Sequence, residues 1–239
     1  SIDNDDSLDL DQLTVAEALP GDCAKIRVAV ADVDVLVPRN SRIDQHAHHN
    51  TTSVYTAAVN FPMLPEALST NLTSLNLEQD RLAIVIEMVI CAEGSLQESN
   101  VCRAFVHNQA KLAYNGVAAW LDKAGEMPPA IAAVAGLADN LMLQDKTAQK
   151  MKQFRQKQGA LTFETLKSKS LFDHDMLRDL VLEERNRAKD IIEDFMVMAN
   201  GVIARYLASK NFPSLRRVVR VPKRWDWIVE IASEENFKL

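Results

Sequence analysis

The segment that decides the fold is residues 25–35, KIRVAVADVDV. Valine recurs along it and apolar residues alternate with polar ones, which is typical of a strand with one buried face. Residues 81–91 (RLAIVIEMVIC) and 101–108 (VCRAFVHN) predict two further strands, and the residues around Gly94 predict the turn that joins them. The first half of the chain therefore predicts a β-sheet.

The second half of the chain has helical periodicity. Residues 110–124 form an amphipathic pattern, and residues 130–158 predict one long helix that ends at Gly159. Residues 183–210 give the clearest helical spacing, and a last helix is expected over residues 222–231, where a proline opens it. Strands followed by helices predict one α+β domain. Its sheet, mixed or antiparallel, comes from the N-terminal half and is packed by helices from the C-terminal half.

Charge is unevenly distributed along the 239 residues, whose net charge is −6. Residues 1–22 contain seven acids and no base, whereas the rest of the chain sums to +1. Residues 205–224 hold seven Lys and Arg and no acid, and residues 150–157 add a second basic cluster. Such stretches favour contacts with phosphates, although many are simply solvated, so the overall acidity does not exclude a nucleic-acid partner.

Several classes of protein are excluded by the composition. No run of 18 apolar residues is present, so no transmembrane helix is expected, and the acidic N-terminus lacks the apolar core of a secretory signal. Cys23, Cys91 and Cys102 lack metal-ligand spacing and fit a reducing compartment. We therefore expect a cytoplasmic monomer that does not associate with a membrane.

The acidic segment suggests a metal site. In an extended chain Asp9 and Asp11 share one face, while Leu8 and Leu10 share the other and anchor the backbone. Two carboxylates so close repel each other unless a hard cation lies between them, and oxygen ligands select Mg²⁺, Mn²⁺ or Ca²⁺. A calcium loop fits less well, because Leu8 and Thr14 stand where the EF-hand pattern has Gly and Glu. A solvated acidic terminus is the alternative.

Six short blocks follow one another along the chain. They are Ile2-Asp3 with Asp9-Leu10-Asp11, VAVADV at 28–33, TSVY at 52–55, PMLPE with LS and SLN within 62–76, AKLAY at 110–114, and IEDFM with AN within 192–200. In this order they resemble the motifs of the ribonuclease II/ribonuclease R catalytic domain, the RNB domain, whose first signature is I-D-x(5)-D-x-D-D. Each block alone is weak, but six in order are specific.

This resemblance implies a 3′→5′ exoribonuclease that hydrolyses single-stranded RNA to nucleoside 5′-monophosphates with Mg²⁺, or Mn²⁺ in its place. Two metal ions could activate water and stabilise the leaving oxygen. By the same resemblance, Asp3, Asp9 and Asp11 are catalytic residues that ligate the metal or orient metal-bound water.

The resemblance also implies residues that bind the RNA. Tyr55 matches an aromatic that stacks near the scissile nucleotide, Phe163 stands where a second clamping aromatic is expected, and Glu193 matches a glutamate near the bound RNA. A core position is the alternative for Phe163. His46, His48 and His49 fall in an expected loop, without the further ligands of a zinc site.

The chain departs from the family pattern in two places. Gln12 replaces the last aspartate of the signature and is counted among the expected catalytic residues. Its amide oxygen can ligate a metal, but the side chain brings no negative charge and cannot act as a base. The family's later S-P-I-R-R-Y block is absent, so residues 1–239 are expected to be a partial RNB-type catalytic domain. The alternatives to an active enzyme are a catalytically impaired RNA-binding member of the family and a protein of structural or regulatory role.

Overall fold

The structure is a computed structural model, and it describes residues 1–56, 59–160, 168–173, 176–182, 186–216 and 223–237. Its strands are β1 (Ile2–Asp3), β2 (Gln12–Leu19), β3 (Cys23–Ala31), β4 (Val54–Tyr55), β5 (Asn60–Phe61), β6 (Asp80–Ile90), β7 (Leu96–His107), β8 (Leu112–Ala113), β9 (Ser168–Asp173) and β10 (Met176–Leu182). Its α-helices are α1 (Arg42–Asn50), α2 (Tyr114–Leu121), α3 (Pro129–Ala132), α4 (Leu137–Lys157), α5 (Arg187–Ser209) and α6 (Trp225–Glu234). A short 3₁₀ helix (Val33–Val35) and a π-helical turn (Ala67–Leu72) complete the elements of the described ranges.

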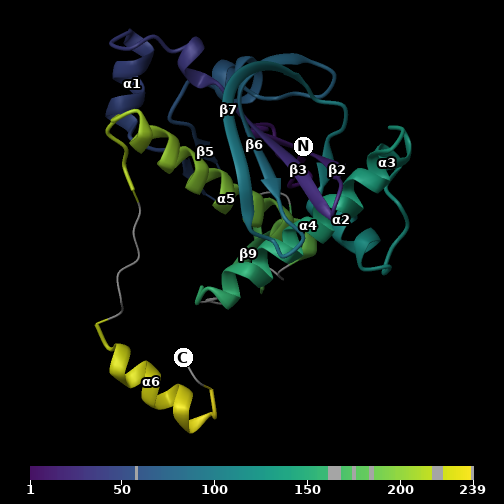
Figure 1. Cartoon of the computed structure of the whole chain (residues 1–239). Helices are drawn as coiled ribbons and strands as arrows, with labels where there is room; N and C mark the ends of the chain where they lie inside the picture. Colours follow the sequence, from purple (N-terminus) through teal and green to yellow (C-terminus); the bar gives the residue numbers. More distant parts are fainter. Residues whose placement is uncertain (57–58, 161–167, 174–175, 183–185, 217–222, 238–239) are drawn as a thin grey trace.

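The main sheet has four antiparallel strands in the order β2-β3-β6-β7. The strands predicted over residues 25–35, 81–91 and 101–108 are its β3, β6 and β7. Helices α4 and α5 cross each other on one face of this sheet (Figure 1). The predicted α+β class is therefore confirmed, with an antiparallel sheet from the N-terminal half and helices from the C-terminal half.

The core lies between the sheet and these two helices. Alternate residues of β3 and β6, among them Ile26 and Met88, point to the helices and are fully buried against Met151 of α4 and Phe195 of α5. Burying side chains of this size contributes roughly 1.5–3 kcal/mol each. A second apolar cluster joins α2, α4 and α5 to β1 and β8, so the first strand of the chain is fixed to the helical layer.

One predicted strand ends earlier than expected, and one predicted helix is divided in two. The 25–35 strand stops at Ala31, because Asp32 is buried in an ion pair with Arg103 of β7 and the chain then turns into the 3₁₀ helix. The helix predicted over 130–158 is two helices, since Gly136 adopts a left-handed φ of 76° between α3 and α4. Gly159, with φ of 86°, does follow the end of α4 as predicted.

The helix predicted over residues 110–124 is shorter than expected, because Leu112–Ala113 pair with β1 in a parallel ladder and α2 begins only at Tyr114. The histidine segment predicted as a loop is the helix α1, whose N-cap Ser41 accepts a hydrogen bond from the backbone of Asp44. The helix predicted over 183–210 is α5, although residues 183–185 lie outside the described ranges. The last helix is α6, and residue 222, its expected start, also lies outside them.

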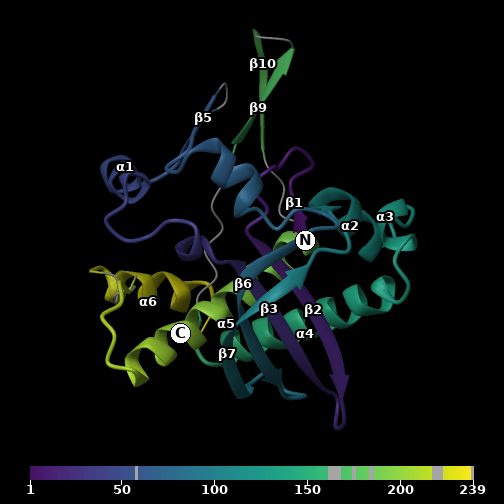
Figure 2. The same cartoon turned by 90° about the horizontal axis from the view of Figure 1, so that it is seen from above.

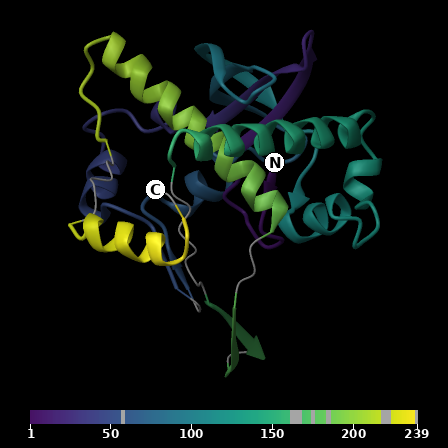
Figure 3. The ribbon, with the colours of Figure 1, turned by 60° about the horizontal axis from the view of Figure 1, so that its bottom comes forward.

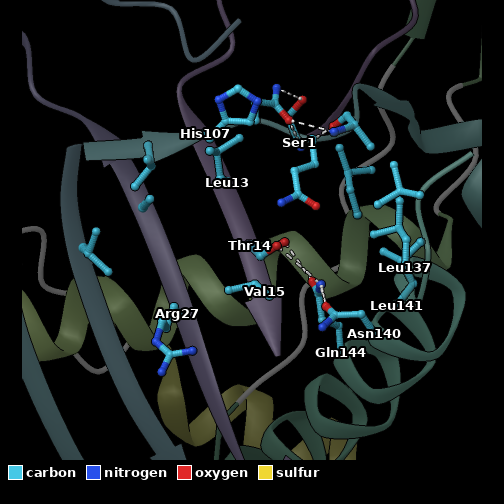
Figure 4. A pocket seen from close by; sticks show the side chains of 18 of the residues that line it. Ser1, Leu13, Thr14, Val15, Arg27, His107, Leu137, Asn140, Leu141 and Gln144 are labelled. Carbon is cyan, nitrogen blue, oxygen red and sulfur yellow. Dashed lines mark hydrogen bonds between the residues drawn. The ribbon is translucent and has the colours of Figure 1, made fainter. Parts of the chain in front are cut away.

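The outer edge of β2 is covered by side chains of α4. Asn140 accepts a hydrogen bond from the backbone N–H of Ala16 and donates one to its carbonyl, at 3.1 and 2.6 Å. Gln144 donates to Asn140 and accepts from the Thr14 hydroxyl, which adds a second amide to the same edge. These groups line a cavity of about 550 Å³ between the sheet and α4 (Figure 4). The polar atoms of Asn140, Gln144 and Thr14 are hydrogen-bonded to one another or to β2. None of the expected site residues lines this cavity.

Two smaller features complete the fold. The hairpin β9–β10 projects from the same side of the body as β5 (Figure 2 and Figure 3). Helix α6 is drawn apart from the rest in Figure 1, with Trp227 exposed. Within the described ranges, no helix has both the length and the apolar character that crossing a bilayer requires.

Candidate metal and RNA site

The acidic segment connects β1 to β2. Asp3 ends β1, which pairs with β8, and Asp9 and Asp11 follow on the loop that leads into β2. The side chain of Leu10 between them is buried, while Leu8 is exposed. The predicted alternation is therefore only half realised, with one leucine anchoring the backbone that carries the two carboxylates.

The loop that carries Asp9 is held by groups distant in sequence. Lys111, just before β8, donates a 2.6 Å hydrogen bond from Nζ to the Ser7 carbonyl. The Ser74 hydroxyl donates to the Leu8 carbonyl and accepts from the Leu10 N–H, both at 2.9 Å. The backbone is thus fixed on both sides of Asp9.

Both carboxylate oxygens of Asp9 accept hydrogen bonds. The Ser7 hydroxyl donates to Oδ1 at 3.1 Å, and the Tyr55 hydroxyl donates to Oδ2 at 2.9 Å. The bond to Asp9 raises the pKa of Tyr55, because a phenolate there would face the carboxylate. Asp3 accepts a bond from the backbone of Asn4.

The three carboxylates influence one another electrostatically. Burial raises the pKa of Asp11, and the negative charges of Asp3 and, more weakly, Asp9 raise it further. Burial, with the same charges of Asp3 and Asp11, raises the pKa of Tyr114 to about 12. No ion pair joins Asp3, Asp9 or Asp11 to a basic side chain in the part of the chain that the structure describes. The site therefore carries uncompensated negative charge.

The donor set suits a hard divalent cation. Carboxylate oxygens are the ligands that Mg²⁺ and Mn²⁺ prefer. Burial raises the pKa of Asp11 most, and a cation would offset both the burial of its charge and the smaller repulsion from Asp3 and Asp9. The side chains of the described residues do not, however, draw together three acidic, His or Cys groups as ligands around one point. The chemistry of the residues thus fits the cation, while their side chains stand apart.

A cavity of about 590 Å³ adjoins these aspartates. Asp3, Asp9 and Asp11 line it together with Tyr55 and Phe61 of the β4–β5 hairpin. The two rings are 65% and 59% exposed. Exposed aromatic rings offer flat apolar faces on which nucleobases can stack.

The structure does not bring all the expected site residues to this cavity. Gln12 is only 6% exposed, and its amide donates a 3.3 Å hydrogen bond to the carbonyl of Ile2, which ties β2 to β1. Glu193 is exposed on α5 and does not line the cavity. Phe163 lies outside the described residues. The catalytic role of Gln12 and the RNA contacts of Phe163 and Glu193 stay predictions.

Several residues of the site were not singled out from the sequence. Ser7, Lys111 and Tyr114 lie in or beside the quoted motif blocks, so the blocks themselves were the available signal. Phe61 carried no signal, because an isolated phenylalanine before two prolines resembles any turn residue. Its place opposite Val54 in the β4–β5 ladder is visible only in the structure.

Comparisons with known proteins agree with the motif blocks. Residues 1–238 match the family model described as "RNB domain". "Ribonuclease R" of Vibrio parahaemolyticus is 32% identical over 223 residues, covering 93% of this chain and 26% of that protein. "Ribonuclease R 2" of Lactococcus lactis is 30% identical over 245 residues, covering 100% of this chain and 36% of that protein.

A solved structure agrees as well. Mycoplasma genitalium RNase R in complex with ribose-methylated single-stranded RNA superposes with a TM-score of 0.90 at 27% identity, over 100% of this chain and 37% of that one. The chain thus spans between about a quarter and two fifths of the length of these relatives. The match over nearly every residue shows that the chain belongs to the RNB domain family.

Proposed function

We propose that this chain is the metal-binding portion of a 3′→5′ exoribonuclease that hydrolyses single-stranded RNA to nucleoside 5′-monophosphates. The observation that carries the proposal is a set of electrostatically coupled carboxylates, Asp3, Asp9 and Asp11, with no basic partner among the described residues. Natural proteins rarely leave such charge unpaired in partly buried places unless a cation or substrate compensates it.

Asp3, Asp9 and Asp11 would hold Mg²⁺, or Mn²⁺ in its place. A divalent cation bound there supplies positive charge for the phosphodiester and lowers the pKa of water that attacks it. The role of the three carboxylates is to fix that charge at one end of the cavity. Phosphodiester hydrolysis needs such neutralisation more than a covalent nucleophile, and no nucleophilic side chain is required of this chain.

The aromatic rings that line the same cavity would bind the substrate. Tyr55 and Phe61 present exposed faces to the space that the aspartates also line. Base stacking contributes roughly 1–3 kcal/mol per base and tolerates every base, which suits an enzyme that degrades RNA of any sequence. The RNA complex of the Mycoplasma genitalium relative supports RNA as the partner.

The alternative is a catalytically impaired RNA-binding member of the family. It is favoured by the position of Gln12, whose amide is buried and engaged with the carbonyl of Ile2 and so adds no negative charge to the site. In this alternative the stacking residues still bind RNA, but the cation site lacks one ligand charge.

A cleavage assay separates the two functions. The protein is incubated with 5′-labelled poly(A) and either Mg²⁺, Mn²⁺ or EDTA. We expect a ladder that shortens from the 3′ end in either metal and stays intact in EDTA. Binding without shortening in both metals would contradict the enzyme, and recovery of shortening by Gln12→Asp would then establish the impaired member.

A further inference from the structure

Asp9 is held differently from the other two aspartates of the site. Each of its carboxylate oxygens accepts a hydrogen bond from a side-chain hydroxyl, Oδ1 from Ser7 and Oδ2 from Tyr55. Two donors on opposite oxygens fix the rotation of the carboxylate about its last bond, which one donor would leave partly free. The plane of the Asp9 carboxylate is therefore set by the protein.

The backbone segments that carry both hydroxyls are held by contacts that do not involve Asp9. Ser7 is held through its backbone, since its N–H donates to the Asn4 carbonyl at 3.2 Å and its carbonyl accepts from Lys111. Tyr55 is held by the ladder that pairs it with Asn60. Tyr55 lies on a strand 46 residues from Asp9, and the backbone of Ser7 is hydrogen-bonded through both its N–H and its carbonyl, so the backbone that carries each donor is held without the carboxylate.

The two bonds leave room for a cation. An ionised carboxylate has about four lone-pair sites, and the two hydroxyl donors occupy two of them. The single hydroxyl proton of Tyr55 is donated to Asp9 Oδ2, because a carboxylate oxygen can only accept. Groups that orient a ligand in this way commonly account for 10–100-fold in metal affinity.

We propose that Ser7 and Tyr55 are positioning residues that orient the Asp9 carboxylate for a divalent cation before it binds. Tyr55 then has two separable parts: a ring that faces the cavity and a hydroxyl that acts on Asp9. One side chain thereby links the nucleotide-binding side of the cavity to the cation-binding side. This inference rests on the proposed function, because it presumes that Asp9 is a ligand.

Direct metal binding tests the inference without RNA. Mn²⁺ is titrated into the chain and into the Tyr55→Phe, Ser7→Ala and double variants, and the bound ion is measured by electron paramagnetic resonance and calorimetry. We expect Tyr55→Phe to weaken Mn²⁺ binding by about 10-fold and the double variant by more. Ser7→Thr, which keeps a hydroxyl, should retain most of the affinity. The matched control is Tyr206→Phe, which removes the hydroxyl of another exposed tyrosine, on α5 and outside the cavity, and should leave Mn²⁺ binding unchanged.

A second measurement separates the ring from the hydroxyl. With EDTA present, RNA affinity should change by less than about twofold in Tyr55→Phe, whereas Tyr55→Ala should lose about fivefold or more. Circular dichroism of each variant checks that it is folded.

The outcomes are distinct. If the parent chain binds Mn²⁺ and the double variant binds it equally well, the inference is overturned while the proposed function stands. If the parent chain itself binds no Mn²⁺, the proposed metal site fails and the inference fails with it.

Discussion

Acidic side chains between α4 and α5 each face a basic partner, whereas those of residues 3–11 have none among the described residues. Arg187 of α5 bonds Asp145 of α4 at 2.5 Å, and Lys152 bonds Asp190 at 2.8 Å. In the site, hydroxyls and backbone groups bond the carboxylates, and these groups leave the negative charge in place.

The difference separates two uses of the same chemical group. A buried carboxylate beside a guanidinium holds two helices together, and removing either partner lowers the free energy of unfolding. A carboxylate held only by neutral donors keeps its orientation and its charge, which is the state that a cation requires. Variants of either region test whether the carboxylates between α4 and α5 and those of residues 3–11 differ in this way.

The largest effect is expected from Asp11→Asn. The amide keeps the shape of the side chain but removes a charge that the site needs, so RNA shortening by the active protein should fall by about 1000-fold while RNA affinity in EDTA is unchanged. The control is Asp22→Asn in the same acidic stretch, whose carboxylate already pairs with Lys146 and Lys150. An undiminished rate in Asp11→Asn would show that the segment is an ordinary solvated acidic surface.

Arg187→Met should have the largest effect on stability. Among the described residues it leaves the buried carboxylate of Asp145 with the amide of Gln149 as its remaining donor, and an unpaired buried charge costs about 3–5 kcal/mol. Urea unfolding followed by circular dichroism measures the loss. Adding Asp145→Asn to the same chain should restore a large part of it; a single variant as stable as the parent would mean that the helix pair does not depend on charge pairing.

Asp194 makes the helix interface sensitive to pH. Burial raises the pKa of this carboxyl to about 6, against the attraction of Arg155 and Lys152. Because the folded chain binds the Asp194 proton more tightly than the unfolded chain does, this group stabilises the fold fully below the pKa of the unfolded state, which is about 4. The stabilisation is lost as the pH rises through about 6, the pKa in the folded state. Between pH 4 and 7 the free energy of unfolding should therefore fall by up to about 3 kcal/mol relative to Asp194→Asn. Parallel pH profiles for the two proteins would contradict the assignment.

The smallest effect is expected at the surface pair of Glu17 and Arg27. The two groups are 3.0 Å apart across β2 and β3 but are 51% and 34% exposed. Exposed pairs contribute less than about 1 kcal/mol, so Glu17→Gln should shift the urea midpoint only slightly, and less still in 1 M salt. A loss as large as that of Arg187→Met would remove the distinction between buried and exposed pairing.

The sheet could be predicted from the sequence where burial is one-sided. The alternation of residues 25–35 and 81–91 reports directly which side chains meet the helices, and both segments are strands. No strand is predicted over residues 12–19, which form β2 in the structure. Its pairing with β3 depends on partners elsewhere in the chain, which local patterns do not contain.

The errors in the helices have local causes. Residues 130–135 are rich in alanine and fit a continuous helix, and only the left-handed backbone of Gly136 separates α3 from α4. Conversely, the histidine segment predicted as a loop is the helix α1, and the Ser41 to Asp44 spacing is a helix-start signal that the sequence contains.

The spacing of Asp9 and Asp11 predicts either a cation site or a solvated acidic segment, and the resemblance adds Tyr55; the cation itself stays a prediction. What the sequence could not show is the contact between them, since Tyr55 reaches Asp9 across 46 residues and Lys111 reaches Ser7 across 104. Such contacts follow from the assembled fold, in which β8 and the β4–β5 hairpin meet the acidic loop from different directions.

The amide side chains that cover β2 hinder the pairing of a further strand at that edge of the sheet. Asn140 bonds the N–H and the carbonyl of Ala16 as a neighbouring strand would, so α4 imitates a fifth strand at that edge. An incoming peptide would have to displace these bonds before it could pair with β2 there. Among the described residues, the opposite edge of the sheet is the twelve-residue strand β7.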